Sequence, residues 1–363
     1  MRVGVSGSVL DRDVGGGTAY ARALYERLRP LGVQAGPMVP PGGRGPVRAL
    51  AYALADGLVW PRTATADLLH YPAGTGALIP ARVPVAATVH GLVPHGPPAY
   101  GPVMNALAPY GPAPHRAAGL RRALGERLWL RRVGGVTRVA DAVITVSEFS
   151  AGEIHRTFGV PARRLHVIPH GVDTGRFHPD GDGDAALLGP LALPPRFVLF
   201  LGAPAPCRNV PLLVEATARL GVPLVAAGAA DAGDRAAVRA LTAPHVRRLG
   251  RVTDGLVAPL LRAAAVLVLP SSREGFGLPV LEAMACGTPA VVSDRGALPE
   301  VAGGAAQVVR SLTVAGLAAA LAEVLEDESY AIGLREQGFG HVRRFTWDAA
   351  ARRHLEVFRD LVG

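Results

Sequence analysis

The feature that most constrains this chain is a repeated alternation of short apolar runs with helical segments. The runs are rich in Val and Leu and bounded by Gly or Pro, which is typical of parallel strands buried on both faces. They form two series, at 2–6, 84–89, 142–146 and 165–169, then at 197–201, 223–227, 265–269 and 290–292. Segments with helical periodicity lie between them, for example 18–31, 151–158, 211–220 and 315–326. This alternation predicts an α/β fold with doubly wound parallel sheets.

The division into two series predicts two domains, which the length of 363 residues also favours. A stretch rich in Gly, Pro and Asp separates the series. We therefore predict an N-terminal domain over 1–175, a linker over 176–189 and a C-terminal domain over 190–347. The final segment, 348–363, is amphipathic, and we expect it to form a helix that packs back onto the first domain.

Composition removes several kinds of chemistry. All 38 basic residues are Arg, so a lysine Schiff base is excluded and any fixed cation is an Arg. The two cysteines, Cys207 and Cys286, do not form a metal-ligand pattern. The N-terminus lacks the apolar core of a signal peptide, and no apolar run approaches the roughly 18 residues of a membrane span. We therefore expect a cytoplasmic protein.

The net charge of +9 is unevenly distributed. Residues 1–179 hold 20 Arg against 10 acidic residues, whereas residues 180–363 hold 18 against 19. An excess in one half suggests an anionic partner, although a solvated basic surface explains it equally well. Nucleic acid is not expected as the partner, because the basic half lacks interleaved aromatic residues and a reading motif.

Part of this excess lies in an Arg-rich segment, 116–138, where Leu residues recur at every fourth position beside Trp129. Such a basic amphipathic helix can lie on an anionic membrane, here the inner face, as a peripheral contact. An ordinary packed helix with a solvated Arg face is the simpler interpretation.

The most distinctive local pattern runs from Ser271 to Pro289, SSREGFGLPVLEAMACGTP. It places Glu274 and Glu282 eight residues apart around a Gly-Phe-Gly turn and a predicted helix start. The N–H groups of a helix N-terminus favour phosphate, and Gly275 lets the backbone approach a ligand closely. Two carboxylates beside a phosphate cradle predict recognition of sugar hydroxyls, because a carboxylate accepts strong hydrogen bonds from them.

Further elements accompany this pattern in a fixed order along the chain. They are Gly15-Gly16-Gly17 before a helix, VAATVHG ending at His90 and Gly91, ADAVITVSEFS (140–150), VIPHGVD (167–173), FVLFLGAPAPCRN (197–209) and the stretch 249–277. Together with the E-x7-E element, they resemble the retaining, nucleotide-sugar-dependent glycosyltransferases related to sucrose synthase and bacterial mannosyltransferases, of the family 4 type. The resemblance spans nearly the whole chain.

The resemblance implies two facing Rossmann-like domains, the GT-B fold, with the active site in the interdomain cleft. It implies a retaining, metal-independent enzyme that moves a hexose-type sugar from a UDP- or GDP-linked donor to an acceptor hydroxyl. The acceptor would be a glycan, a lipid-linked saccharide or glycolipid, or a small secondary metabolite. No cofactor or metal ion is expected. The alternative is a catalytically silent nucleotide-sugar-binding or membrane-docking module.

By the same resemblance, Glu274 contacts hydroxyls of the transferred sugar and Glu282 contacts the ribose. Backbone N–H groups of Phe276, Gly277 and Leu278 meet the phosphates. Arg208 stabilises charge on the leaving diphosphate. The family usually has a positive pair at this point, and Cys207 stands where the first cation is expected, so Arg251 or Arg273 is a candidate to compensate.

In the first domain, the resemblance brings His90 near the transferred sugar, and Gly16 and Gly17 near the donor. Arg251 and Val252 would present backbone groups to the base. Residues 91–114 would form an acceptor loop. Plainer interpretations stay open at this stage: His90 as a core histidine bonded to a backbone carbonyl, the three glycines as a turn, and the charged residues as solvated or helix-start groups.

Overall fold

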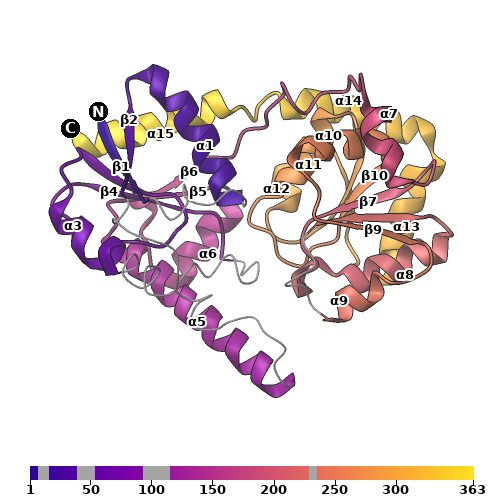
Figure 1. Ribbon diagram of the computed structural model, residues 1–363, viewed down its shortest axis with the longest axis horizontal. Coiled ribbons are helices and arrows are strands. Elements are labelled where there is room, and N and C mark those ends of the chain that lie inside the picture. Colours follow the sequence, from indigo (N-terminus) through magenta and orange to yellow (C-terminus); the bar gives the residue numbers. More distant parts are fainter. Residues whose placement is uncertain (7–15, 39–53, 93–114, 229–234) are drawn as a thin grey trace. The chain divides into compact units, whose positions relative to one another are not determined.

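The computed structural model describes residues 1–6, 16–38, 54–92, 115–228 and 235–363 (Figure 1). The chain divides into two compact units. Unit 1 comprises Met1–Gly171 and Trp347–Gly363, and unit 2 comprises Val172–Thr346. The division therefore lies slightly before the predicted linker, 176–189, whose residues belong to unit 2. There, Arg262 donates two hydrogen bonds to Asp184, at 2.6 and 2.7 Å, and so holds this segment against its own unit.

Unit 1 contains a six-stranded parallel sheet with the order β2-β1-β3-β4-β5-β6. Its strands are β1 (Arg2–Ser6), β2 (Gln34–Met38), β3 (Leu68–Tyr71), β4 (Val85–Val89), β5 (Ala142–Thr145) and β6 (Leu165–Val167). Its helices are α1 (Gly16–Leu28), α3 (Trp60–Thr63), α5 (His115–Val139), α6 (Glu148–Phe158) and α15 (Trp347–Val362), with short turns η1 (Arg29–Leu31), η2 (Ala55–Val59) and η4 (Ala162–Arg164). Each predicted strand of the first series is present.

Helices cover both faces of the unit 1 sheet. Helices α1 and α15 pack together and form one apolar core with the strands, with Tyr20, Trp347 and Phe358 among its buried side chains. Helices α5 and α6 form the other, where Trp129 and Ile154 are buried. In the described part of α5, the Trp129 side of the Arg-rich segment therefore faces the sheet. Among the described residues, no helix combines the length and the apolar character that crossing a membrane requires.

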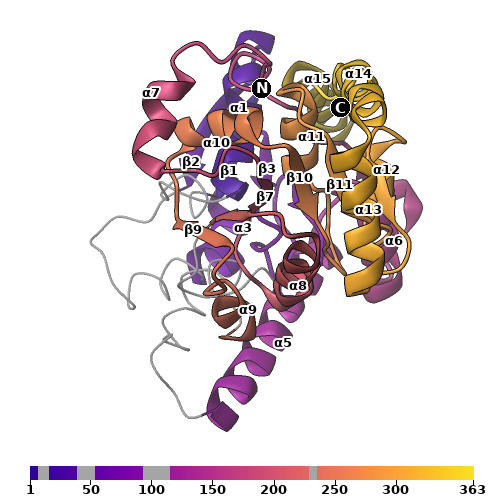
Figure 2. The same ribbon diagram turned by 90° about the vertical axis from the view of Figure 1, so that its right-hand side faces the viewer.

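Unit 2 also contains a six-stranded parallel sheet, with the order β12-β11-β10-β7-β8-β9. Its strands are β7 (Val198–Leu201), β8 (Leu224–Ala227), β9 (Val246–Gly250), β10 (Val266–Leu269), β11 (Ala290–Ser293) and β12 (Gln307–Val309). Its helices are α7 (Asp184–Leu188), α8 (Val210–Leu220), α9 (Arg235–Ala240), α10 (Asp254–Ala263), α11 (Leu278–Ala285), α12 (Leu298–Ala302), α13 (Val314–Glu326) and α14 (Glu328–Val342), with turns η5 (Gly189–Leu191) and η6 (Pro206–Arg208). Helices α8 and α13 lie side by side (Figure 2).

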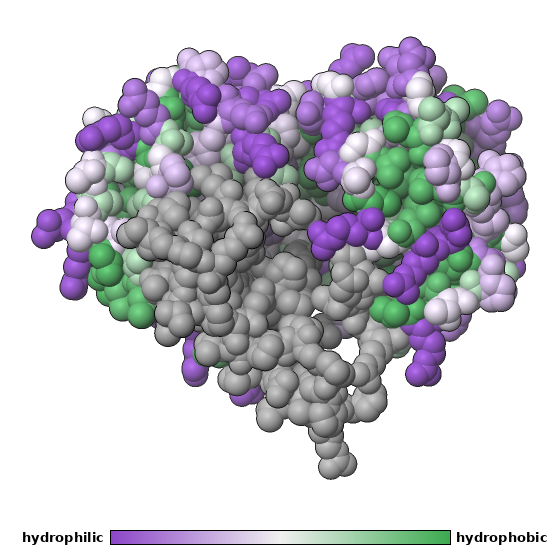
Figure 3. All heavy atoms as spheres, in the orientation of Figure 1, coloured by the Kyte–Doolittle hydropathy of each residue, from purple (hydrophilic) through white to green (hydrophobic). Residues whose placement is uncertain are grey.

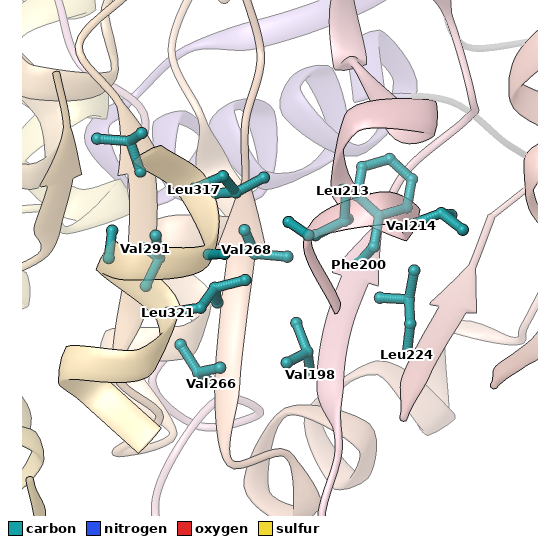
Figure 4. Packing of buried hydrophobic residues seen from close by; sticks show 14 of the residues in the cluster. Val198, Phe200, Leu213, Val214, Leu224, Val266, Val268, Val291, Leu317 and Leu321 are labelled. Atoms are coloured by element: carbon teal, nitrogen blue, oxygen red, sulfur yellow. The ribbon is translucent and has the colours of Figure 1, made fainter. Parts of the chain in front are cut away.

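The core of unit 2 is built from short aliphatic side chains. Val198 and Phe200 of β7 and Val268 of β10 meet Leu213 of α8 and Leu317 of α13 (Figure 4). On the face drawn in Figure 3, hydrophilic and apolar residues are interspersed over the described surface. The parallel sheets of both units confirm the predicted α/β fold class.

Candidate active site

The strand order of unit 2 creates a place for a ligand at the carboxyl ends of β7 and β10. The chain runs outward from β7 to β8 and β9 on one side, then returns to β10 and continues to β11 and β12 on the other. The loops that leave β7 and β10 therefore turn to opposite sides. In open α/β sheets, ligands bind at such a switch point.

Arg208 and Glu274 meet at this switch point. Arg208 ends the turn η6 after β7, and Glu274 lies in the loop after β10. Nη1 of Arg208 lies 2.5 Å from Oε2 of Glu274, and the two side chains are only 14% and 8% exposed. Nη1 of Arg208 also donates to Oγ of Ser271, at 3.4 Å. The structure thus brings together two of the predicted site residues as a largely buried ion pair.

The two loops are tied to each other by hydrogen bonds to the backbone. Nδ2 of Asn209 donates to the carbonyl of Pro270 at 2.7 Å. The carbonyl of Cys207 accepts from the backbone N–H of Ser272 at 2.7 Å and from its hydroxyl at 3.2 Å. Cys207 therefore contributes to the site through its carbonyl group, while its side chain brings no positive charge.

Glycine is required on both sides of Glu274. Gly296 has a φ of +65°, and a Cβ there would lie 2.6 Å from the backbone N and O of Glu274. The carbonyl of Glu274 accepts from Ala297 N at 2.9 Å. Gly277, with a φ of +101°, precedes helix α11, and a Cβ there would lie 2.7 Å from Cδ2 of Leu298. These close approaches place the first turn of α11 beside the ion pair.

Helix α11 begins at Leu278, and Glu282 lies one turn into it. Gly277 has no side chain to cap the helix, and N–H groups in the first turn of a helix favour an anion. Glu282 is half-buried, and this burial raises the pKa of its carboxyl group to about 7. Asp254 raises the pKa further, whereas the guanidinium of Arg176 lowers it. Near pH 7 this carboxyl group is therefore poised between its neutral and charged forms.

The remaining predicted residues of unit 2 lie in different surroundings. Phe276 and Gly275 are buried beside Glu274, and Leu278 is half-buried. Arg251 and Val252 follow β9, which is separated from β7 by β8. Both Arg251 and Arg273 are exposed, but only Arg273 belongs to the loop that carries Glu274.

In unit 1, the structure surrounds the ring of His90 with protein groups. His90 follows β4, and its Nε2 lies 2.8 Å from the carbonyl oxygen of Pro72. Its Nδ1 lies 3.3 Å from Nε2 of His170, and the two rings are stacked with centroids 5.2 Å apart. A bond to a backbone carbonyl is what the core-histidine interpretation expects. Gly16 and Gly17 open helix α1, whereas Gly15 and most of the expected acceptor loop, residues 93–114, lie outside the described residues.

Sequence reasoning missed a group of residues around His90. Tyr20 contacts the rings of both His90 and His170, and its hydroxyl lies within hydrogen-bonding distance of Thr88 and His354. Only His170 had a signal, since it stands within VIPHGVD. Thr88 is the single polar residue of an apolar strand, whereas Tyr20 and His354 lie in helices that carry several other polar residues, so nothing in the sequence distinguishes them. In the described part of the chain, no group of three or more His, Cys, Asp or Glu side chains is arranged to hold a metal ion.

Comparison with known proteins agrees with this architecture. Residues 16–176 match the family described as Glycosyltransferase Family 4, and residues 195–327 match that described as Glycosyl transferases group 1. The O-antigen chain mannosyltransferase B of Escherichia coli is 30% identical over 232 residues, which span 61% of this chain and 61% of that protein. The match thus spans about three fifths of the length of this relative.

Two solved structures show the same fold over the whole chain. Sucrose-phosphate synthase from Thermosynechococcus elongatus superposes with a TM-score of 0.75 at 22% identity, covering 99% of both chains. Anabaena Alr3699/HepE, solved in complex with UDP-glucose, superposes with a TM-score of 0.73 at 17% identity, covering 99% of this chain and 100% of that one. The two family matches lie one after the other along the chain, and both are to glycosyltransferases, so the chain is a family 4-like glycosyltransferase.

Proposed function

We propose that this protein transfers a hexose-type sugar from a nucleoside diphosphate sugar to an acceptor hydroxyl, with retention of the anomeric configuration and without a metal ion. The observation that carries the proposal is the buried pair of Arg208 and Glu274 at the switch point of unit 2, beside the N-terminus of α11. The complex of HepE with UDP-glucose, a protein of the same fold, supports a nucleotide sugar as donor.

Each group of unit 2 has a role that follows from its chemistry. The guanidinium of Arg208 has five N–H donors, so it can keep Glu274 and also donate to the diphosphate. The first turn of α11 adds N–H donors and a partial positive charge. These groups would do the work of a divalent cation, which is to stabilise negative charge on the departing diphosphate.

The two glutamates would recognise the two sugars of the donor. Glu274, beside Arg208, accepts hydrogen bonds from hydroxyls of the transferred sugar. Glu282, one helical turn into α11, accepts them from the ribose. Backbone groups of Phe276, Gly277 and Leu278 contact the phosphates, and those of Arg251 and Val252 contact the base. Gly16 and Gly17 are assigned to the donor, and His90 to the transferred sugar.

The reaction requires one bond to break and one to form on the same face of the sugar. The bond from the anomeric carbon to the β-phosphate oxygen breaks, and the acceptor oxygen bonds to that carbon. The acceptor proton passes to the leaving phosphate. We assign no enzymic nucleophile, because Glu274, the carboxylate assigned to the transferred sugar, is held in the ion pair with Arg208.

A glycan or a lipid-linked saccharide is our first choice of acceptor, since the E. coli relative is named for the O-antigen chain. An anionic membrane would then be met through the Arg-rich segment 116–138. Liposome flotation with and without anionic lipid tests this contact separately from transfer.

The donor is tested first by thermal-shift titration with UDP, GDP, ADP and dTDP in a buffer containing chelator. Binding to the native state raises the melting temperature with the logarithm of ligand concentration. We expect a selective rise with one nucleotide, then transfer in chelator to a panel of saccharide acceptors, with the anomeric configuration read by NMR. Binding without any transfer or hydrolysis would favour the silent module, and a strict metal requirement or an inverted product would refute the mechanism.

A further inference from the structure

A chain of side-chain hydrogen bonds runs through unit 1 between helices α1 and α15. It begins at Tyr25 of α1, whose Oη lies 2.5 Å from Nδ1 of His70 on β3. Nε2 of His70 lies 2.8 Å from Oγ1 of Thr88 on β4, two residues before His90. Oγ1 of Thr88 lies 3.0 Å from Oη of Tyr20, again on α1. Three elements of the unit are thus joined through buried polar groups.

The chain of hydrogen bonds ends on the C-terminal helix α15, and the last bond determines which atoms carry the protons. Oη of Tyr20 lies 2.7 Å from Nε2 of His354, and Nδ1 of His354 lies 2.7 Å from the carbonyl oxygen of Ala350. A carbonyl only accepts, so Nδ1 of His354 carries a hydrogen. Burial lowers the pKa of His354 to about 4, which keeps the ring neutral, so its Nε2 accepts from the hydroxyl of Tyr20.

The same logic assigns every other donor. Because the single hydroxyl proton of Tyr20 points to His354, the Thr88 hydroxyl must donate to Tyr20. Thr88 then accepts from Nε2–H of His70, and Nδ1 of His70 accepts from the hydroxyl of Tyr25. Burial lowers the pKa of His70 and raises those of both tyrosines, so all members are neutral. Each donor has one acceptor, and all five bonds point from Tyr25 toward Ala350.

Tyr20 connects this chain with His90. The centroid of its ring lies 4.6 Å from that of His90 and 5.2 Å from that of His170, both in edge-on contacts. Nε2–H of His90 donates to Pro72, and in a neutral ring its Nδ1 then accepts from Nε2–H of His170. Tyr20 therefore lies against both members of the histidine pair while its hydroxyl is held at two points.

We propose that His354 and Tyr20 are positioning residues for His90: the C-terminal helix, through His354, orients Tyr20, and the ring of Tyr20 holds the His90–His170 pair in one orientation. The proposal rests on the proposed function only in the statement that His90 approaches the transferred sugar. The proton assignment and the orientation of the pair stand independently of it.

The first test measures the tautomers in the unliganded protein. Nitrogen-15 NMR of histidine-labelled protein distinguishes Nδ1–H from Nε2–H, and single His→Gln variants assign the signals. We expect Nδ1–H for His354 and Nε2–H for His70, His90 and His170. Finding His354 as the Nε2–H tautomer, or as a charged ring at pH 7.5, would overturn the assignment.

The second test compares two matched variants of α1, Tyr20→Phe and Tyr25→Phe. Each removes one hydroxyl from the same buried chain, but only the ring of Tyr20 contacts His90. A purely structural role predicts that both lower the melting temperature and neither alters the His90 signals. We expect the nitrogen signals of His90 and His170 to shift in Tyr20→Phe alone. Equal His90 signals in both variants would refute the positioning role.

Turnover supplies the third test, with UDP-glucose hydrolysis as the probe reaction. Tyr20→Phe and His354→Phe should lower kcat roughly 10- to 100-fold, the range expected for a misplaced group, with KM changed little. His354→Gln keeps an acceptor for Tyr20 and should recover most of the loss. A shifted His90 signal together with an unchanged kcat would overturn the functional part of the proposal. If the unaltered protein does not hydrolyse UDP-glucose, that result counts against the choice of donor, and the NMR test then decides the positioning role.

Discussion

Nucleotide affinity is expected to depend on pH through Glu282. Burial on α11, with Asp254 nearby, raises the pKa of this carboxyl group to about 7. In the proposed role of Glu282, ribose hydroxyls would donate hydrogen bonds to the carboxylate and so stabilise its charged form. Binding would therefore expel a proton from Glu282, and the affinity would rise as the pH rises.

The size of the effect follows from the pKa. If the carboxylate form binds much more tightly than the neutral acid, affinity should increase by up to about tenfold between pH 6 and pH 8, or about 1.4 kcal/mol. At pH 7 about half a proton should leave for each nucleotide bound. The folding stability of the unliganded protein should instead fall as the pH rises. A folded pKa raised above the ordinary value of 4.5 means that stability is lost as pH rises from 4.5 through 7, by up to about 3 kcal/mol.

Isothermal titration calorimetry in two buffers of different ionisation enthalpy measures this proton directly. The ligand is the nucleoside diphosphate that gives the largest thermal shift. Because its terminal phosphate also titrates near pH 7, Glu282→Gln is the matched control: the amide keeps the size of the side chain but cannot ionise. The difference in proton release between the two proteins reports the carboxyl group alone. Equal proton release in both, or equal pH dependence of affinity from pH 6 to 8, would refute the reasoning.

Three further predictions concern other parts of the chain. Gly296→Ala should weaken nucleotide binding and should destabilise unit 2 by more than the control Gly304→Ala does. At Gly304 the left-handed backbone costs an alanine about 1–2 kcal/mol, but its Cβ would have no atom within 4 Å. Equal losses of stability in urea melts would contradict this prediction. Glu274→Gln should lower turnover at least about 100-fold while the protein stays folded, because Arg208 loses its charged partner, and near-normal kcat would exclude the assigned role. As the pH falls from 6.5 to 4, the protein should lose about 3 kcal/mol of stability through His354 alone, because this histidine has a lower pKa in the folded than in the unfolded state and acid therefore favours unfolding. The His354→Gln protein should lose less stability over the same range. Acid titration followed by circular dichroism measures the difference.

All eight predicted strands are present. Seven of them are largely buried, as a continuous apolar run implies, whereas the eighth, β6, is a half-buried edge strand. The strands that were missed include the edge strands β2, β9 and β12, whose sequences QAGPM, VRRLG and QVV are partly exposed. The interior strand β3 was also missed, and His70 within it is buried as a member of the hydrogen-bond chain.

Sequence alone therefore determined the fold class, the two sheets and the local pattern of Glu274, the glycine turn and Glu282, because each depends on residues close together in the chain. Tertiary structure decided which distant groups meet. The pair of Arg208 and Glu274 depends on the order of strands in a sheet, and that of Tyr20 and His354 joins residues 334 positions apart. Periodicity carries no information on such contacts, since a hydroxyl in a helix looks the same in sequence whether it meets water or a buried imidazole.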